Sequence, residues 1–167
     1  MARTPARAKA QPDTDSLVGK RPPAFDLETD GGGRVRLKDF AGRKVVVYFY
    51  PANDTAGCTL EAVDFTKAAA AFAKAGTDIV GISPDPVKSH DRFKTKHKLG
   101  ITLASDPDKK TIEAYNLWVE KQMYGRKFMG VERATYLIGA DGKVAQEWRK
   151  VRVPGHVEAV LDAARNL

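Results

Sequence analysis

Short apolar runs alternate along the chain with longer segments of helical character. Runs rich in β-branched and aromatic residues predict strands, and these runs cover residues 44–50, 78–83, 101–105, 134–138 and 143–148. Helices are expected over residues 62–75, 86–98 and 107–115, and over a last segment after Pro154 and Gly155. Because strands alternate with helices, the pattern predicts an α/β layer architecture.

Cap and turn residues set the bounds of these elements. Gly76 and Gly100 lie where a helix C-cap glycine belongs. Asp85 is expected to cap the second helix, with Pro86 as its first residue. The Asp-Gly pair at 141–142 lies between two apolar runs and predicts a hairpin.

Glycines at 31–33 mark a turn near the N-terminus. The turn is expected to join a short strand at 25–27 to a second at 34–37, with one helical turn over 37–40. A phosphate-binding loop is disfavoured, because no lysine-serine or lysine-threonine pair follows the glycines.

The segment 117–131 interleaves aromatic and sulfur-containing side chains with basic ones. Such a mixture can bind single-stranded nucleic acid through stacking and charge. We favour a hairpin or loop that covers the core, because large apolar side chains are usually buried.

The only cysteine, Cys58, falls between the strand at 44–50 and the helix that follows, in the first helical turn. Free N–H groups and the positive end of the helix dipole favour a thiolate at this position. The alternative is that Cys58 is a small buried apolar residue. Thr55 could likewise be only an N-cap, with its hydroxyl bonded to an N–H near Cys58.

The residues around Cys58 carry a family resemblance. Pro51-xxx-Thr55-xx-Cys58, with Glu61 three residues on, resembles the peroxidatic site of peroxiredoxins. The longer string over 48–62 resembles the bacterioferritin-comigratory-protein (PrxQ) subfamily, and the likeness extends over nearly the whole chain. It implies a thioredoxin-like fold with an N-terminal extension and a central mixed sheet flanked by helices.

The resemblance implies a thiol peroxidase that reduces hydrogen peroxide and organic hydroperoxides. Cys58 would be the nucleophile, oxidised to a sulfenic acid. Thr55 would hydrogen-bond the peroxide, and the N–H groups of Gly57 and Cys58 would add donors. Pro51 would close the pocket over the sulfur.

Arg133 matches the position of the family's active-site arginine, at the start of a strand. Its guanidinium would stabilise the thiolate and the charge that develops on oxygen. Glu61, one helical turn past Cys58, would hold Arg133 in place. The alternatives are a solvated arginine on an edge strand and an acid that complements the helix dipole.

The chain departs from the subfamily at Val63, where many members carry a resolving cysteine. A one-cysteine cycle is therefore implied, in which an external thiol attacks the Cys58 sulfenic acid. Thioredoxin, glutaredoxin or a low-molecular-weight thiol could act as this reductant. The alternative function is a thioredoxin-fold redox sensor or binding protein with little turnover.

The remaining residues argue against other cysteine chemistries. None of the three histidines is an evident partner for Cys58, which disfavours a cysteine hydrolase. There is no Cys-x-x-Cys and no metal-ligand spacing. We expect neither a metal nor a cofactor.

Composition bounds the setting of this chemistry. A chain of 167 residues predicts one domain, over 17–167, behind a disordered or loosely attached basic tail at 1–16. The net charge of +7 is interpreted as a solvated surface rather than a nucleic-acid site. No apolar run is long enough for a membrane, and a lone cysteine suits a reducing compartment. We expect a cytoplasmic protein, monomeric or weakly homodimeric.

Overall fold

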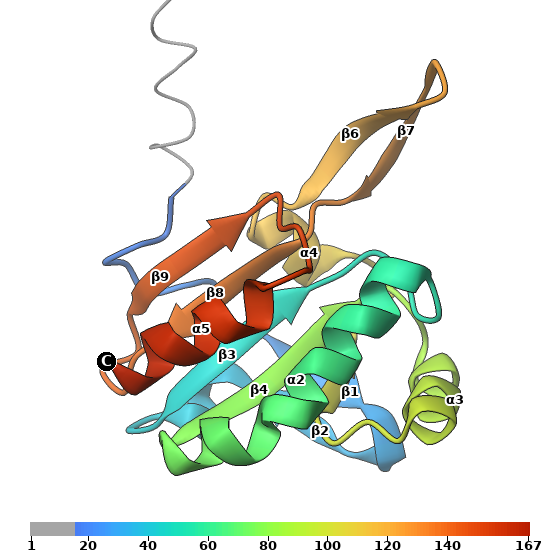
Figure 1. The fold of residues 1–167 in the computed structure, drawn as a ribbon. Coiled ribbons are helices and arrows are strands. Elements are labelled where there is room, and N and C mark those ends of the chain that lie inside the picture. Colours follow the sequence, from blue (N-terminus) through green and yellow to red (C-terminus); the bar gives the residue numbers. More distant parts are fainter. Residues whose placement is uncertain (1–15) are drawn as a thin grey trace, which may run out of the picture.

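The computed structural model describes residues 16–167. Its main sheet has seven strands in the order β2-β1-β5-β4-β3-β8-β9 (Figure 1). The strands are β1 (Asp26–Thr29), β2 (Arg34–Arg36), β3 (Lys44–Phe49), β4 (Thr77–Ser83), β5 (Thr102–Ser105), β8 (Ala134–Ile138) and β9 (Val144–Arg149). β4 pairs in parallel with both β3 and β5, whereas β1–β2, β1–β5, β3–β8 and β8–β9 are antiparallel.

The helices are α2 (Ala56–Lys74), α3 (Val87–His97), α4 (Lys110–Ala114) and α5 (His156–Arg165). Short 3-10 turns, η1 (Asp30–Gly32) and η2 (Leu37–Phe40), flank β2. The predicted architecture is confirmed as a mixed sheet flanked by helices, and the expected last helix buries Val157, Val160 and Ala164.

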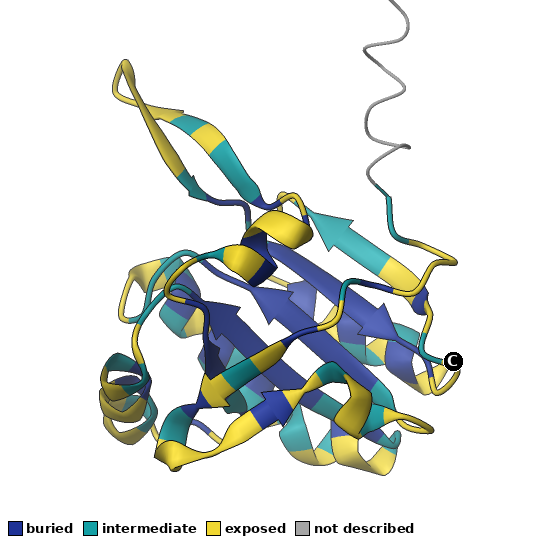
Figure 2. Ribbon diagram, turned by 180° about the vertical axis from the view of Figure 1, so that it is seen from behind, coloured by how far each residue is buried: buried dark blue, intermediate teal, exposed yellow. Residues whose placement is uncertain are grey.

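Both faces of the sheet are covered, and β3 shows why. Its residues alternate between two hydrophobic clusters, because successive strand side chains point to opposite faces. Val45, Val47 and Phe49 belong to the cluster that includes Ile112 of α4. Val46 and Tyr48, with Tyr50 just after the strand, belong to the cluster formed with α2, α3 and α5. The sheet interior is therefore buried on either side (Figure 2).

The beginning of α3 differs from the prediction. Pro86 is the N-cap, with extended backbone angles, and α3 begins at Val87. Asp85 does not cap the helix; its Oδ2 accepts hydrogen bonds from Ser83 Oγ at 2.6 Å and from Asn53 N at 2.8 Å. The Asp85 carboxylate therefore binds the loop after β3 instead of capping α3. The local sequence gives no signal for this long-range contact.

The segment after α4 forms a separate hairpin of β6 (Trp118–Met123) and β7 (Arg126–Val131). A hairpin or a loop was predicted here and the hairpin is found, but the expectation that it covers the core is wrong. It projects from the body (Figure 1), and only its base packs inward, through Trp118 and Val131. Four large side chains of the hairpin are exposed: Met123 at 57%, Tyr124 at 96%, Phe128 at 44% and Met129 at 49%.

The start of the described chain is tied to β9. Leu17 N donates to Glu147 Oε1 at 2.9 Å, and Gly19 N donates to Val144 O at 2.8 Å. Residues 1–15 of the predicted tail lie outside the described residues. Among the described helices, none has the length and apolar character needed to cross a membrane.

Gly81 in β4 allows a close approach of Tyr48, and its replacement is expected to destabilise the fold. A Cβ at position 81 would lie 2.7 Å from Tyr48 Cζ, and the Tyr48 ring is fully buried. Gly81→Ala should lower the free energy of unfolding by about 1–3 kcal/mol. Denaturant titration measures this loss.

Gly100→Ala is the matched control. Its Cβ would meet the nearest atom, Thr66 Cγ2, at 3.6 Å, which is an ordinary contact. An equal loss in both variants would contradict the packing argument.

Candidate active site

Cys58 lies where β3 leads into α2. The chain turns through residues 51–55 and enters the helix at Ala56, with Thr55 as an extended N-cap residue (φ −93°, ψ 157°). Cys58 is 1% exposed and is a free cysteine, not part of a disulfide. It occupies the first turn of a 19-residue helix, whose free N–H groups and dipole favour an anion.

Strand pairing brings Arg133 to this helix start. β8 runs antiparallel to β3, and Ala134 is the Cα partner of Phe49. Arg133, one residue before β8, therefore lies beside the end of β3, although Cys58 is 75 residues away in sequence. Because β8 lies between β3 and β9, it is not an edge strand.

The guanidinium of Arg133 joins the thiol to a carboxylate. Its Nη2 donates to Cys58 Sγ at 3.2 Å, and its Nη1 donates to Glu61 Oε1 at 2.7 Å. The side chain of Arg133 is 17% exposed and that of Glu61 is 0% exposed. The structure thus brings together three of the residues singled out from the sequence.

Gly57 gives the guanidinium room. A Cβ at this position would lie 3.3 Å from Arg133 Nη2, which is tighter than an ordinary contact. The absence of a side chain allows the cation to lie against the first turn of α2, beside Cys58.

The buried carboxylate is unusual in its ionisation. Burial raises the pKa of Glu61 to about 7, although Arg133 acts in the opposite direction. Its second oxygen, Oε2, is without a hydrogen-bond partner in the described part of the chain, as is the Tyr48 hydroxyl. Burial also disfavours the charged form of Arg133, but Glu61 and Cys58 outweigh it, and the pKa of Arg133 is raised.

Glu61 should therefore make stability depend on pH. Its pKa is raised from 4.5 to about 7, so within that window the folded state binds more protons than the unfolded state. Stability contributed by this group is present at low pH and falls as pH rises through the window. The surrounding titratable groups are Arg133, Asp64 and Cys58 on α2, and Tyr48 and Tyr50 at the end of β3.

Glu61→Gln should remove this dependence. The difference in free energy of unfolding between the variant and the parent protein should rise by about 1–3 kcal/mol from about pH 5 to about pH 8, in favour of the variant. Denaturant titration at the two pH values measures the gain. Glu113→Gln, at an exposed position of α4, is the control. Parallel pH profiles of the parent and Glu61→Gln proteins would contradict the expectation.

Thr55 and Pro51 lie in the turn that leads to Cys58. The Thr55 hydroxyl donates to Ala52 O at 3.1 Å and makes no cap hydrogen bond to the helix. The alternative view of Thr55 as a side-chain cap is therefore wrong. Thr55 is exposed and Pro51 half-buried.

A network of polar side chains connects this turn to α3, and sequence reasoning missed it. Asn53 Nδ2 donates to His90 Nδ1 and to Ser89 Oγ, each at 3.0 Å, and Tyr50 Oη donates to Asn53 Oδ1 at 2.7 Å. His90 Nε2 faces Ala104 O at 3.0 Å. His90 is fully buried, and burial lowers its pKa. A neutral ring that donates through Nε2 and accepts at Nδ1 satisfies both contacts.

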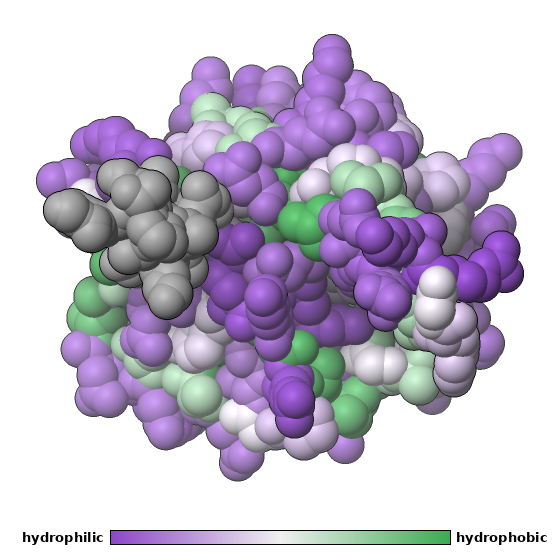
Figure 3. All heavy atoms as spheres, turned by 90° about the horizontal axis from the view of Figure 1, so that it is seen from above, coloured by the Kyte–Doolittle hydropathy of each residue, from purple (hydrophilic) through white to green (hydrophobic). Residues whose placement is uncertain are grey.

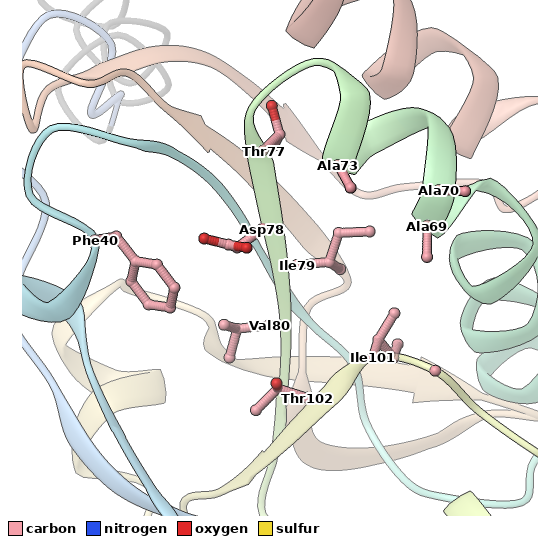
Figure 4. Close-up of a pocket in the computed structure, with 11 residues that line it drawn as sticks. Phe40, Ala69, Ala70, Ala73, Thr77, Asp78, Ile79, Val80, Ile101 and Thr102 are labelled. Carbon is pink, nitrogen blue, oxygen red and sulfur yellow. The ribbon is translucent and has the colours of Figure 1, made fainter.

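A groove of about 550 Å³ lies away from this site, beside the start of β4 and the C-terminal half of α2 (Figure 4). Alanines of α2, Ile79 and Ile101 line much of it. Its only titratable lining residue is Asp78, which pairs with Arg43 at 2.9 Å. None of its lining residues belongs to the cluster of Cys58, Arg133 and Glu61.

Comparison with known proteins agrees with this geometry. The AhpC/TSA family model matches residues 18–147. Peroxiredoxin Bcp of Bacillus subtilis is 40% identical over 150 residues, which cover 90% of this chain and 96% of that protein. Among solved structures, peroxiredoxin Q of Xanthomonas campestris has a TM-score of 0.81 at 44% identity, covering 85% of this chain and 90% of the other.

A second structure, of the Xanthomonas campestris bacterioferritin comigratory protein, is described by its alkyl peroxide reduction activity. It has a TM-score of 0.81 at 43% identity and covers 85% of this chain and 90% of its own. The fold and the relatives thus define a thiol-dependent peroxidase with a thioredoxin-like fold. The chain belongs to the AhpC/TSA family and, within it, is a peroxiredoxin of the bacterioferritin-comigratory-protein (PrxQ) type.

Proposed function

We propose that this peroxiredoxin works with Cys58 as its peroxidatic residue, in a cycle that needs no second cysteine of its own. The observation that carries the proposal is the hydrogen bond from Arg133 Nη2 to Cys58 Sγ at 3.2 Å. A buried thiol beside a guanidinium and a helix N-terminus is favoured as a thiolate, the nucleophilic form.

In the first step the Cys58 thiolate attacks the terminal oxygen of a hydroperoxide. A sulfur–oxygen bond forms as the O–O bond breaks, sulfur is oxidised to a sulfenic acid, and the departing alkoxide takes up a proton to become an alcohol. Hydrogen peroxide would give water instead. The alkyl peroxide activity ascribed to the Xanthomonas campestris relative supports organic hydroperoxides as substrates.

Donors around the sulfur would stabilise the charge that develops on oxygen. Arg133 supplies a cation next to Cys58, and the N–H groups of Gly57 and Cys58 belong to the first turn of α2. We assign the Thr55 hydroxyl to the peroxide itself, since its bond to Ala52 O can be exchanged for one to a substrate. Pro51 would limit the access of water.

Thr55→Val should slow the reaction with peroxide by about 10- to 100-fold, because one donor to the substrate is lost. Thr55→Ser keeps the hydroxyl and should remain close to the parent rate. Stopped-flow measurement of Cys58 oxidation gives both values. Equal rates for the valine and serine variants would exclude a role for the hydroxyl.

The second step requires a thiol from outside the chain, since Cys58 is its only cysteine. The external thiol attacks the sulfenic sulfur, forms a mixed disulfide and releases water. A second thiol then reduces that disulfide and restores Cys58. Thioredoxin, glutaredoxin and low-molecular-weight thiols are the reductants we propose to compare. A reducing cytoplasm would supply them.

Mass spectrometry of Cys58 after one equivalent of peroxide tests this cycle. We expect a gain of one oxygen on the residue and its loss when the right reductant is added. Repeated turnover with that reductant supports the peroxidase. A long-lived sulfenic acid that no thiol reduces would favour a redox sensor, and an unmodified Cys58 would overturn the proposal.

A further inference from the structure

The β6–β7 hairpin rises directly from the peroxide site. β7 ends at Val131, two residues before Arg133. The base of the hairpin is fastened by a hydrogen bond from Glu132 N to Leu117 O at 2.8 Å. The end of the molecule from which the hairpin projects is mainly hydrophilic, with scattered apolar side chains (Figure 3).

Lys121 on β6 directs its side chain toward this base. Its Cα partner across the hairpin is Phe128. Its stem nevertheless lies over Gly130: a Cβ on that glycine would be 3.2 Å from Lys121 Cδ and 3.4 Å from its Cε. Gly130 is two residues closer to Arg133 than Phe128 is, so the ammonium lies toward the site and away from the hairpin tip.

The ammonium of Lys121 makes no ion pair or hydrogen bond within residues 16–167, and the residue is only half-exposed. On the opposite face of the same hairpin, Lys127 pairs with Glu120 at 3.8 Å and is 70% exposed. Lys121 is therefore a half-buried cation whose side chain leans toward the end of the hairpin that lies beside Arg133 and Cys58.

The charges around Lys121 fit this geometry. Burial and Arg133 lower the pKa of Lys121, whereas Cys58 and Glu132 raise it. The ammonium is thus within electrostatic range of the sulfur, although the two make no contact.

We propose that Lys121 is a second cation of the peroxide site, carried by the hairpin, which stabilises the anionic form of Cys58. This inference rests on the proposed function of Cys58. The titratable groups around the sulfur and Lys121 are Arg133 and Glu132 from the β7–β8 connection, Glu61 from α2, and the buried Tyr48 and Tyr50 at the end of β3. Arg133, Glu61 and Glu132 each belong to an ion pair, so Lys121 is the charged group that can be changed without breaking one.

Lys121→Met should shift the pH profile of the Cys58 reaction. Removing the Lys121 charge, which acts on Cys58 from a moderate distance and through an intermediate effective dielectric constant, should lower the rate by about 3- to 10-fold. We expect that loss near neutral pH and little loss at alkaline pH, where the thiol ionises regardless. Lys121→Arg should restore the rate. Lys127→Met removes a charge from the opposite face and should match the parent protein.

Two readouts keep the result unambiguous. The rate of Cys58 oxidation reports catalysis, while the ultraviolet absorbance of the thiolate against pH reports ionisation without any peroxide. Should the parent protein consume no peroxide, the function proposed for Cys58 fails, but the thiolate titration still tests Lys121. Identical titrations of Lys121→Met and Lys127→Met would overturn the role of Lys121.

Gly130→Ala is a second variant that leaves every charge in place. Its methyl group would displace the Lys121 stem, so a smaller shift in the same direction is expected. Circular dichroism checks that each variant is folded. A loss of rate that is the same at every pH would indicate a purely structural hairpin and would also overturn the proposal.

Discussion

Peroxide consumption is expected to fall by at least about 1,000-fold when Cys58 is replaced by serine, because the hydroxyl is not ionised at neutral pH and cannot take the place of a thiolate. The chain has no other cysteine to substitute for it. Serine is close to cysteine in size, so the buried site should stay folded. Peroxide consumption in the presence of a thiol gives the activity, and thermal unfolding gives the stability.

Thr59→Ser, the next residue along α2, is the control for a conservative change in the same turn. It should keep the parent activity. Undiminished turnover by Cys58→Ser would rule out Cys58 as the nucleophile.

Arg133→Met should have the second largest effect, and it should act on both activity and stability. Loss of the cation beside Cys58 should reduce kcat/KM by about 100- to 1,000-fold. The change also leaves Glu61 buried without its partner, which should cost about 3–5 kcal/mol while the carboxylate is charged. Steady-state kinetics and denaturant titration separate the two effects.

The double variant Arg133→Met with Glu61→Gln distinguishes the roles further. Removing the orphaned carboxylate should recover most of the stability but none of the activity. Lys94→Met breaks another partly buried ion pair, with Asp30 at 2.6 Å, and should cost stability alone. Recovery of activity in the double variant would show that Arg133 serves only the fold.

The sequence predicted most of the elements because their signals are local. A β-branched run, a turn and an alanine-rich helix specify β3, the loop and α2, and with them the place of Cys58. The pairing of Arg133 with Cys58 has no such signal, since it depends on β8 lying next to β3. The family resemblance supplied that pairing, and the sheet register explains it.

The differences from prediction also have physical causes. Asp85 has the residue type of a helix cap, but its carboxylate is used by Asn53 and Ser83 instead. The hairpin contains apolar residues that suggested burial, yet burial requires a facing surface, and beyond the hairpin's base the body provides none. The network through His90 joins residues up to 40 positions apart, which periodicity cannot reveal.

The alignment of β8 against β3 has a consequence for insertions and deletions. One residue of strand spans about 3.3 Å, and a slip of one residue turns every side chain to the opposite face. A slip of β8 would therefore carry the guanidinium off the sulfur it now touches at 3.2 Å, with every active-site residue still present. Insertions or deletions within β8 should therefore be as damaging as loss of Arg133, although β8 itself contributes no reactive atom. Natural length variation should be confined to the connecting loops.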